Sequence, residues 1–286
     1  MARKDYPKSL SIVILGLVYA VAAAAGVIIF RISTVYLHLS EITALLLADV
    51  AATVIVWLFD LNFENVSVYD PYWSVTPPVM FTALAIYTGF FTLPVILLLI
   101  AVWYWGIRLT CNWARTFKGL GHEDWRYAKY RETLPKFSFE LTNLFGLVMM
   151  PTLLVFTCMV PGFKLFQAPN HAYLLTWLGF LMCLVAATVQ LVADNQGHRF
   201  REAHPGQVCD AGLWKHGRHP NYFGEILMWW GVWVMYVSFY GIDWLILGPI
   251  AMTALFLFIS IPLMEGRQLE NKPGYADYRK KTRILI

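Results

Sequence analysis

Long apolar stretches, separated by short charged loops, constrain this sequence more than any other feature. A hydrocarbon core about 30 Å thick is crossed by a helix of ~20 apolar residues. Helices are expected rather than strands, because backbone groups in lipid must be satisfied within the segment and no apolar/polar alternation is present. The eight predicted spans lie near residues 11–30, 42–59, 77–91, 93–113, 139–160, 171–193, 222–240 and 243–264.

The predicted fold class is therefore all-α, a polytopic membrane helix bundle with seven to eight transmembrane helices. Composition agrees, since 58% of the residues are hydrophobic and only 14% are charged, against about a quarter charged in soluble domains. The third and fourth stretches form one apolar run that is broken at residues 88–94. This run is too long for a single helix, so we expect a tight hairpin there.

Lysine and arginine are distributed unequally between the loops, and this bias sets orientation in a membrane. With eight spans, the N-terminus, loops 114–138 and 194–221 and the tail 265–286 share one side and hold nineteen of the twenty-two basic residues. We expect both termini to be cytoplasmic, in a bacterial inner membrane or, if the source is eukaryotic, the endoplasmic reticulum. The net charge of +4 is explained by this bias, so no nucleic-acid partner is expected.

No soluble nucleotide-binding motif accompanies the spans. The sequence has no Gly-x-Gly-x-x-Gly after a strand and no phosphate-binding loop of the Walker type. Its four cysteines form no Cys-x-x-Cys and no metal-ligand spacing. We therefore expect no metal, and any cofactor must bind among the helices and the cytoplasmic loops.

The densest group of chemically active side chains lies at residues 212–225. Pro220 suits the first turn of a helix, whose free N–H groups then point toward the cytoplasmic loop and favour an anion. Asn221 and Glu225 are four residues apart and share a helix face, which can bind a carboxamide or ribose while the loop binds phosphates. A capped helix with basic headgroup anchors is the simpler alternative, but it gives Asn221 and Glu225 no role. The basic side chains beside the turn are Lys215, Arg218 and His219.

From about residue 40 to residue 286 the chain resembles the membrane steroid 5α-reductase family and its bacterial relatives of the domain-of-unknown-function 1295 type. The resemblance implies a single transmembrane domain over 1–286, with an extra N-terminal helix in 1–40 and a C-terminal cofactor-binding half at 139–286. The motifs that carry it are Asp70-Pro71-Tyr72-Trp73, Trp105-Gly106-Ile107-Arg108-Leu109, Glu123-Asp124-Trp125-Arg126-Tyr127, Ala193-Asp194 with Arg199 and Arg201, Gly212-Leu213-Trp214, Arg218-His219-Pro220-Asn221-Tyr222-Phe223-Gly224-Glu225, Pro262-Leu263-Met264-Glu265 and Pro273-Gly274-Tyr275-Ala276-Asp277-Tyr278.

The resemblance implies that NADPH enters from the cytoplasm and reduces the carbon-carbon double bond of an apolar enone. The expected substrate is a 3-oxo-4-ene steroid or a similar lipid that enters from the bilayer, among membrane lipids, and accepts hydride at its β-carbon. The residues expected to bind NADPH are Asp194, Arg199, Arg201, Trp214, Arg218, His219, Asn221, Tyr222, Glu225, Glu265, Tyr275, Tyr278 and Arg279. Those expected to bind the substrate are Trp73, Trp105 and Arg108.

The expected catalytic residues are Tyr69, Asp70 and Tyr104. Negative charge grows on the ketone oxygen as hydride arrives, so a hydrogen-bond donor there lowers the barrier. The human reductases use a Gln-Glu pair and a tyrosine for this purpose. This chain lacks the Gln-Glu pair; Tyr69 and Asp70 occupy roughly that place, and Tyr104 or Trp105 that of the tyrosine. An interfacial aromatic is the alternative reading of Tyr104.

Two other functional classes stay open at this point. The Arg-His-Pro-x-Tyr-x-Gly core is shared with isoprenylcysteine and phospholipid methyltransferases, which bind S-adenosylmethionine, and with sterol C14 reductases. It therefore indicates a cofactor-binding superfamily and not one reaction. The main alternative is an S-adenosylmethionine-dependent membrane methyltransferase, and the second is a non-catalytic membrane scaffold or lipid carrier.

Overall fold

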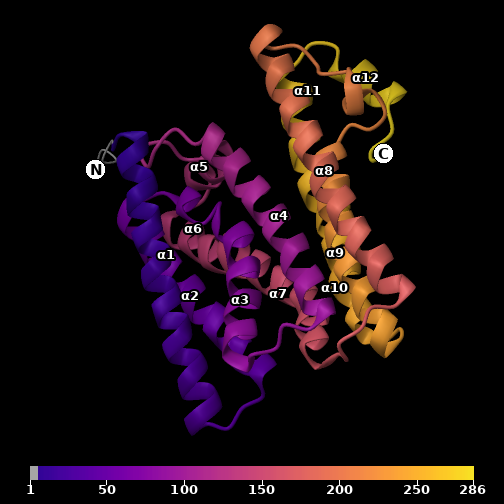
Figure 1. Cartoon of the computed structure of the whole chain (residues 1–286). Helices are drawn as coiled ribbons and strands as arrows, with labels where there is room; N and C mark the ends of the chain where they lie inside the picture. The colour runs from indigo at the N-terminus through magenta and orange to yellow at the C-terminus, as the bar shows by residue number, and fades with distance from the viewer. Residues whose placement is uncertain (1–5) are drawn as a thin grey trace. The chain divides into compact units, whose positions relative to one another are not determined.

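A computed structural model describes residues 6–286 and shows, in that part of the chain, a succession of helices (Figure 1). Three π-helical segments, at Ile32–Tyr36, Thr142–Met149 and Phe256–Ser260, continue or join the α-helices. The α-helices are α1 (Lys8–Arg31), α2 (Glu41–Phe63), α3 (Tyr72–Thr88), α4 (Leu93–Thr116), α5 (Trp125–Thr133), α6 (Lys136–Leu141), α7 (Met150–Lys164), α8 (Leu174–Ala203), α9 (Pro220–Tyr240), α10 (Leu247–Leu255), α11 (Ile261–Asn271) and α12 (Tyr275–Lys281).

Six helical stretches among the described residues are long and apolar enough to cross a membrane, which confirms a multi-pass integral membrane protein. The third and seventh predicted spans correspond to α3, of 17 residues, and α9, of 21 residues. The exact number of crossings stays a prediction. The six stretches are Lys8–Tyr36, Glu41–Phe63, Leu93–Thr116, Lys136–Gln167, Leu174–Ala203 and Trp244–Asn271.

The predicted break between the third and fourth spans is present, because α3 ends at Thr88 and α4 begins at Leu93. Gly89, directly after α3, has a φ of 71°, a conformation that glycine adopts without a steric penalty. The start of α3 differs from the prediction, since the helix begins at Tyr72 and contains Pro77 and Pro78. The predicted span began at residue 77, so two prolines that would have stood in its first turn lie inside α3 instead.

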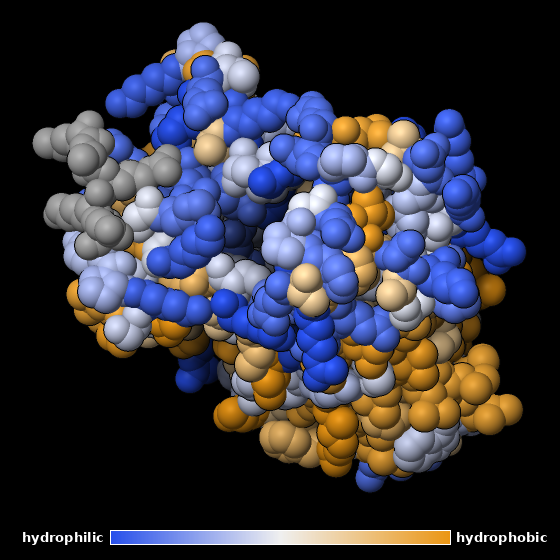
Figure 2. Space-filling view, turned by 90° about the horizontal axis from the view of Figure 1, so that it is seen from above, coloured by the Kyte–Doolittle hydropathy of each residue, from blue (hydrophilic) through white to orange (hydrophobic). Residues whose placement is uncertain are grey.

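Large apolar side chains are exposed along the predicted spans. On α1, Leu17 is 64% exposed, and on α3 Ile86 is 70% exposed. Soluble proteins rarely expose contiguous apolar surfaces of this kind, so these side chains fit a lipid environment. In Figure 2 the face viewed from above is largely hydrophilic, whereas hydrophobic side chains gather along the flanks.

The chain forms two compact units. The first contains the described residues up to Ala83 together with Leu109–Phe156, and the second contains Leu84–Arg108 and Thr157–Ile286. In the first unit α1 packs along α2, and polar side chains hold the segment between α2 and α3. Asn65 donates through Nδ2 to the carbonyl oxygen of Leu120 (2.7 Å), and Val66 N donates to Glu123 Oε1 (3.0 Å).

In the second unit α8 and α9 pack closely along their length, and glycines make this approach possible. A Cβ at Gly179 would lie 2.6 Å from the carbonyl oxygen of Gly231, and one at Gly224 would lie 2.7 Å from that of Ala186. Small residues at such contacts let membrane helices pack backbone against backbone. The same contact brings polar side chains of α8 and α9 together, which builds the site described next.

The charge bias predicts that loop 114–138 and the C-terminal tail share a compartment. Single cysteines placed at Tyr130 and Lys280 should both be labelled by a membrane-impermeant maleimide only after the cells are permeabilised. A cysteine at Pro169, predicted to lie on the opposite side, is the control and should be labelled in intact cells. Labelling of positions 130 and 280 from opposite sides contradicts this orientation. The native thiols to be replaced first are Cys111, Cys158, Cys183 and Cys209.

Candidate functional site

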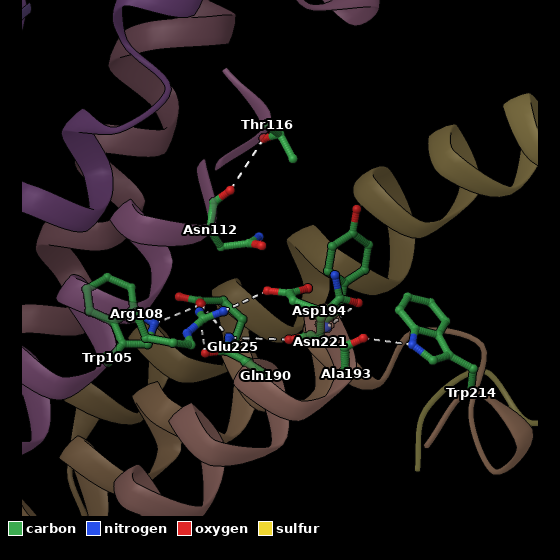
Figure 3. A network of polar contacts seen from close by, with 11 residues as sticks. Trp105, Arg108, Asn112, Thr116, Gln190, Ala193, Asp194, Trp214, Asn221 and Glu225 are labelled. Atoms are coloured by element: carbon green, nitrogen blue, oxygen red, sulfur yellow. Dashed lines mark hydrogen bonds and ion pairs between the residues drawn. The ribbon is translucent and has the colours of Figure 1, made fainter. Parts of the chain in front are cut away.

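A buried carboxylate, Glu225, lies at the centre of a polar network in the second unit (Figure 3). Its side chain is on the second turn of α9, and the residue is only 3% exposed. Trp105 Nε1 on α4 donates to Glu225 Oε2 (2.9 Å), Gln190 Nε2 on α8 donates to the same oxygen (2.7 Å), and Trp229 Nε1 on α9 donates to Oε1 (3.0 Å). Three helices therefore supply the donors that make this burial possible.

Arg108 extends the network along α4 and α8. It donates through Nη2 to Gln190 Oε1 (2.6 Å) and through Nη1 to Asp194 Oδ2 (2.9 Å). Gln190 thus accepts from Arg108 and donates to Glu225, so the charges at the two ends of the network are joined through one amide group.

A second buried carboxylate, Glu265 on α11, holds the turn that precedes α9. Arg218 Nε lies 2.7 Å from Glu265 Oε1, and Arg279 Nε lies 2.9 Å from Oε2. His219 Nε2 is 3.2 Å from Glu265 Oε1, and its ring stacks on Tyr222 with centroids 5.3 Å apart. Burial lowers the pKa of His219 and outweighs the opposing effect of Glu265, so we treat the ring as neutral at physiological pH.

Residues after α12 complete the same turn. Arg218 N donates to the carbonyl oxygen of Arg283 (2.9 Å), and His219 N donates to that of Ile284 (3.1 Å). The Arg218 guanidinium also donates through Nη1 to the carbonyl oxygens of Arg279 and Thr282. These contacts occupy Arg218, so its main structural role is to tie the turn before α9 to α11 and to the C-terminal tail.

A pocket of about 160 Å³ opens beside this turn. Aromatic rings, cationic groups and two side-chain amides line it. Trp214 is held there because its Nε1 donates to the carbonyl oxygen of Ala193 (2.9 Å). Its cations include Lys272, whose pKa is lowered by burial and by the neighbouring Arg201. The lining residues are Gly197, Arg201, Val208, Cys209, Trp214, Arg218, His219, Asn221, Tyr222, Met264, Gln268, Lys272, Tyr275 and Tyr278.

A second, more open pocket of about 360 Å³ shares Val208 with the first. Phe200 of α8 and His204, directly after this helix, stack there with ring centroids 4.7 Å apart. Together the two pockets provide an aromatic and cationic surface at the end of α8. The other lining residues of the second pocket are Gly206, Gln207, Asp210 and Pro273.

With the exception of Arg199, the predicted cofactor residues lie in three separate groups. Arg199 is exposed and lines neither pocket. Asp194 and Glu225 belong to the buried network, and Glu265 and Arg279 form the ion-pair group behind the turn. The residues that line the 160 Å³ pocket are Arg201, Trp214, Arg218, His219, Asn221, Tyr222, Tyr275 and Tyr278.

The predicted substrate residues Trp105 and Arg108 are buried in the Glu225 network, at 0% and 6% exposed. Trp105 Nε1 contacts Glu225 of α9 and the two Nη groups of Arg108 contact α8. Arg108 Nε, by contrast, is buried without a hydrogen-bond partner among the described residues. Trp73, the third predicted substrate residue, is partly buried on α3 in the first unit.

The predicted catalytic residues lie in separate surroundings. In the first unit, Tyr69 Oη is 2.8 Å from Thr152 Oγ1, and Tyr127 Oη donates to Asp70 Oδ1 (2.6 Å). Burial raises the pKa of Asp70 to about 6, against the opposing effects of Arg126 and Tyr127. Tyr104, in the second unit, has its hydroxyl 3.1 Å from Thr188 Oγ1.

Several residues of the site were not in the predicted set. Gln190 and Trp229 are both essential to the Glu225 network. Gln190 could have been recognised from the sequence, because a lone amide in an apolar span usually has an interhelical hydrogen-bond partner. Trp229 gave none, since aromatic residues are frequent throughout this helix. Cys209 and Lys272 line the pocket from loops and carry no motif.

The fold and the site define a multi-pass α-helical membrane protein with an aromatic and cationic pocket at the end of the α8–α9 helix pair. Residues 56–282 match the family described as protein of unknown function (DUF1295), and the chain belongs to this family. An uncharacterized protein of Schizosaccharomyces pombe is 23% identical over 275 aligned positions, which cover 84% of this chain and 78% of the yeast protein. No solved structure matches the chain.

Removing the central carboxylate should destabilise the second unit. Glu225→Ala leaves three buried N–H donors without an acceptor, at about 1–3 kcal/mol each, and should lower the melting temperature in detergent by about 6 °C or more. Asp277→Ala is the control, because this exposed carboxylate only meets Lys280 at 3.8 Å, and it should leave the melting temperature unchanged. Equal melting temperatures for the two variants contradict the assigned role of Glu225.

Proposed function

We propose that this protein is an NADPH-dependent reductase of the carbon-carbon double bond of an apolar enone, with a 3-oxo-4-ene steroid as the preferred substrate class. The observation that carries the proposal is the 160 Å³ pocket, which gathers eight of the residues that the family resemblance assigns to NADPH. Membership of a family of unknown function is compatible with this activity and does not specify it.

The chemistry of the pocket fits a nucleotide. Trp214, Tyr222, Tyr275 and Tyr278 provide aromatic faces, and Arg201 with Lys272 provides positive charge for phosphate. A volume of about 160 Å³ is below the usual 300–1,000 Å³ of a ligand site, so this pocket suits part of a dinucleotide. The adjoining 360 Å³ pocket offers space for the rest.

Each group of residues has a distinct task in the proposed reaction. NADPH, when bound, would supply the hydride that the enone accepts at its β-carbon, and a proton from the medium would reach the α-carbon. Asn221, at the start of α9 and on the pocket wall, has the donors and the acceptor that pair with a carboxamide. The Glu225 network holds α9 in place beneath Asn221. A donor to the ketone oxygen comes from Tyr69, Tyr104 or Asp70.

The methyltransferase alternative uses the same surface. A basic turn with aromatic side chains also suits the adenosine and carboxylate of S-adenosylmethionine, so the pocket alone does not distinguish the two cofactors. The 2′-phosphate of NADPH does, because it needs a cation that S-adenosylmethionine and NADH do not require. Arg201 and Lys272 favour the phosphate-bearing cofactor, and a direct titration separates the cases.

Tryptophan fluorescence of the purified protein should report NADPH binding that is at least tenfold tighter than NADH binding. Asn221→Ala should weaken NADPH binding about tenfold, because the proposed amide partner of the carboxamide on the pocket wall is lost. Asn271→Ala, an exposed residue of α11 outside both pocket linings, is the matched control and should bind as the parent does. Equal affinity for the two nicotinamides, or binding of S-adenosylmethionine alone, contradicts the proposal.

The proton donor can be identified from single-turnover oxidation of NADPH by a 3-oxo-4-ene steroid. If one of the two tyrosines is the donor, its variant, Tyr69→Phe or Tyr104→Phe, should slow hydride transfer about 10²–10³-fold. The same variant should leave NADPH affinity unchanged. Burial raises the pKa of Tyr69 above its ordinary value, so a rate that depends on Tyr69 is constant between pH 6 and 8.

If Asp70 is the donor, the rate of hydride transfer should depend on pH in a different way. Only its neutral form donates, and its pKa is about 6, so the rate should fall tenfold per pH unit above this value. The variant Asp70→Asn should then be slow and independent of pH. Full activity in the Asp70 variant and in both tyrosine variants means that none of these residues is the donor.

A further inference from the structure

A group of buried polar atoms in the first unit has no hydrogen-bond partner. Asp60, near the end of α2, is 1% exposed and Asn143 is 0% exposed. Both carboxylate oxygens of Asp60, both polar side-chain atoms of Asn143, and Oε2 of Glu140 are buried without a partner. The carboxylate of Asp60 lies within reach of the amide of Asn143, yet no well-aligned hydrogen bond joins them. Unpaired atoms on buried groups are rare and point to an unseen water or ion.

The backbone beside these atoms is unusual. Asn143 belongs to the π-helical segment Thr142–Met149, which packs against α2 and in which Asn143 and Val148 are buried. Isolated π-helical turns within longer helices are frequent at functional sites. The wider turn presents the Asn143 amide to Asp60 near one end of a membrane-spanning helix.

The local charges are not balanced. Arg131 is the cation in these surroundings that affects Asp60, but it is already held by Glu123 through two hydrogen bonds of 3.2 and 3.0 Å. The carboxylates of Asp60 and Glu140 are therefore in excess. Buried charges are normally paired or coordinate an ion, so this region lacks one positive charge or more.

We propose that Asp60, Asn143 and Glu140 form a binding site for a small monovalent cation, of which sodium is the probe. Two carboxylates and an amide carbonyl are hard oxygen ligands, which suit such an ion, with water completing its shell. Among the described residues, no group of three or more His, Cys, Asp or Glu side chains could hold a metal ion, so this site has two carboxylates and takes its other ligands from the Asn143 carbonyl and water. The site shares no residue with the nucleotide pocket, so it does not depend on the proposed reduction.

A matched pair of aspartates on α2 tests the proposal. Asp49 is also buried, at 4% exposed, but its Oδ1 accepts from Tyr72 Oη (2.8 Å). Radioactive sodium should bind to the purified parent protein with a stoichiometry of about one displaceable ion per chain. Asp60→Asn should lose at least tenfold in affinity, because the carboxylate is the charged ligand, whereas Asp49→Asn should bind as the parent does.

Thermal stability gives a second measurement on the same proteins. Sodium at tenfold its dissociation constant should raise the melting temperature of the parent by about 3 °C over choline chloride of equal ionic strength. The melting temperature of Asp60→Asn should be the same in both salts. In Asn143→Leu, which removes the carbonyl ligand, sodium should raise the melting temperature by less than in the parent. Equal melting temperatures of the parent in the two salts, without saturable sodium binding, overturn the proposal and leave a neutral, protonated Asp60 as the explanation.

Discussion

The polar interior of the second unit depends on one carboxylate being fully paired inside an apolar environment. Glu225 accepts hydrogen bonds from donors on α4, α8 and α9, and each bond fixes the rotation of the helix that supplies it. Because a buried carboxylate without donors is costly, the three helices cannot rotate independently. The network therefore fixes the relative rotation of the three helices. It also holds the start of α9, with Asn221, at a defined place on the pocket wall.

The pocket is built by the ends of α8, α9 and α11 together with short segments between and after them. Trp214, anchored to α8, and the tyrosines of α12 close it from opposite chain regions. Glu265 connects these regions through Arg218 and Arg279. Side chains from helix ends and from loops therefore share this surface, and loops positioned by a helical scaffold are common places for binding residues.

Patterns local in sequence predicted the main features well. The apolar runs gave the membrane class, the break after Thr88 was visible, and Pro220 marked the start of α9. Partners distant in sequence could not be predicted. Nothing near Arg218 shows that Glu265, which lies beyond α9 and α10, binds its guanidinium. The π-helical segments were also missed, since their apolar composition is that of any span. The sequence could have indicated that only one of Arg199 and Arg201 faces the pocket, because residues two apart on a helix point in different directions.

The pairing of the C-terminal tail with the turn before α9 has a consequence for biosynthesis. The carbonyl groups that receive Arg218 and His219 belong to residues about 65 positions further along the chain. At ~5–20 residues per second of translation, the turn leaves the ribosome several seconds before its partners exist. Insertion of α9, α10 and α11 must proceed with an unfinished pocket. A ligand of this pocket therefore cannot assist the insertion of these helices. It can bind only to chains in which the C-terminal tail has already been synthesised.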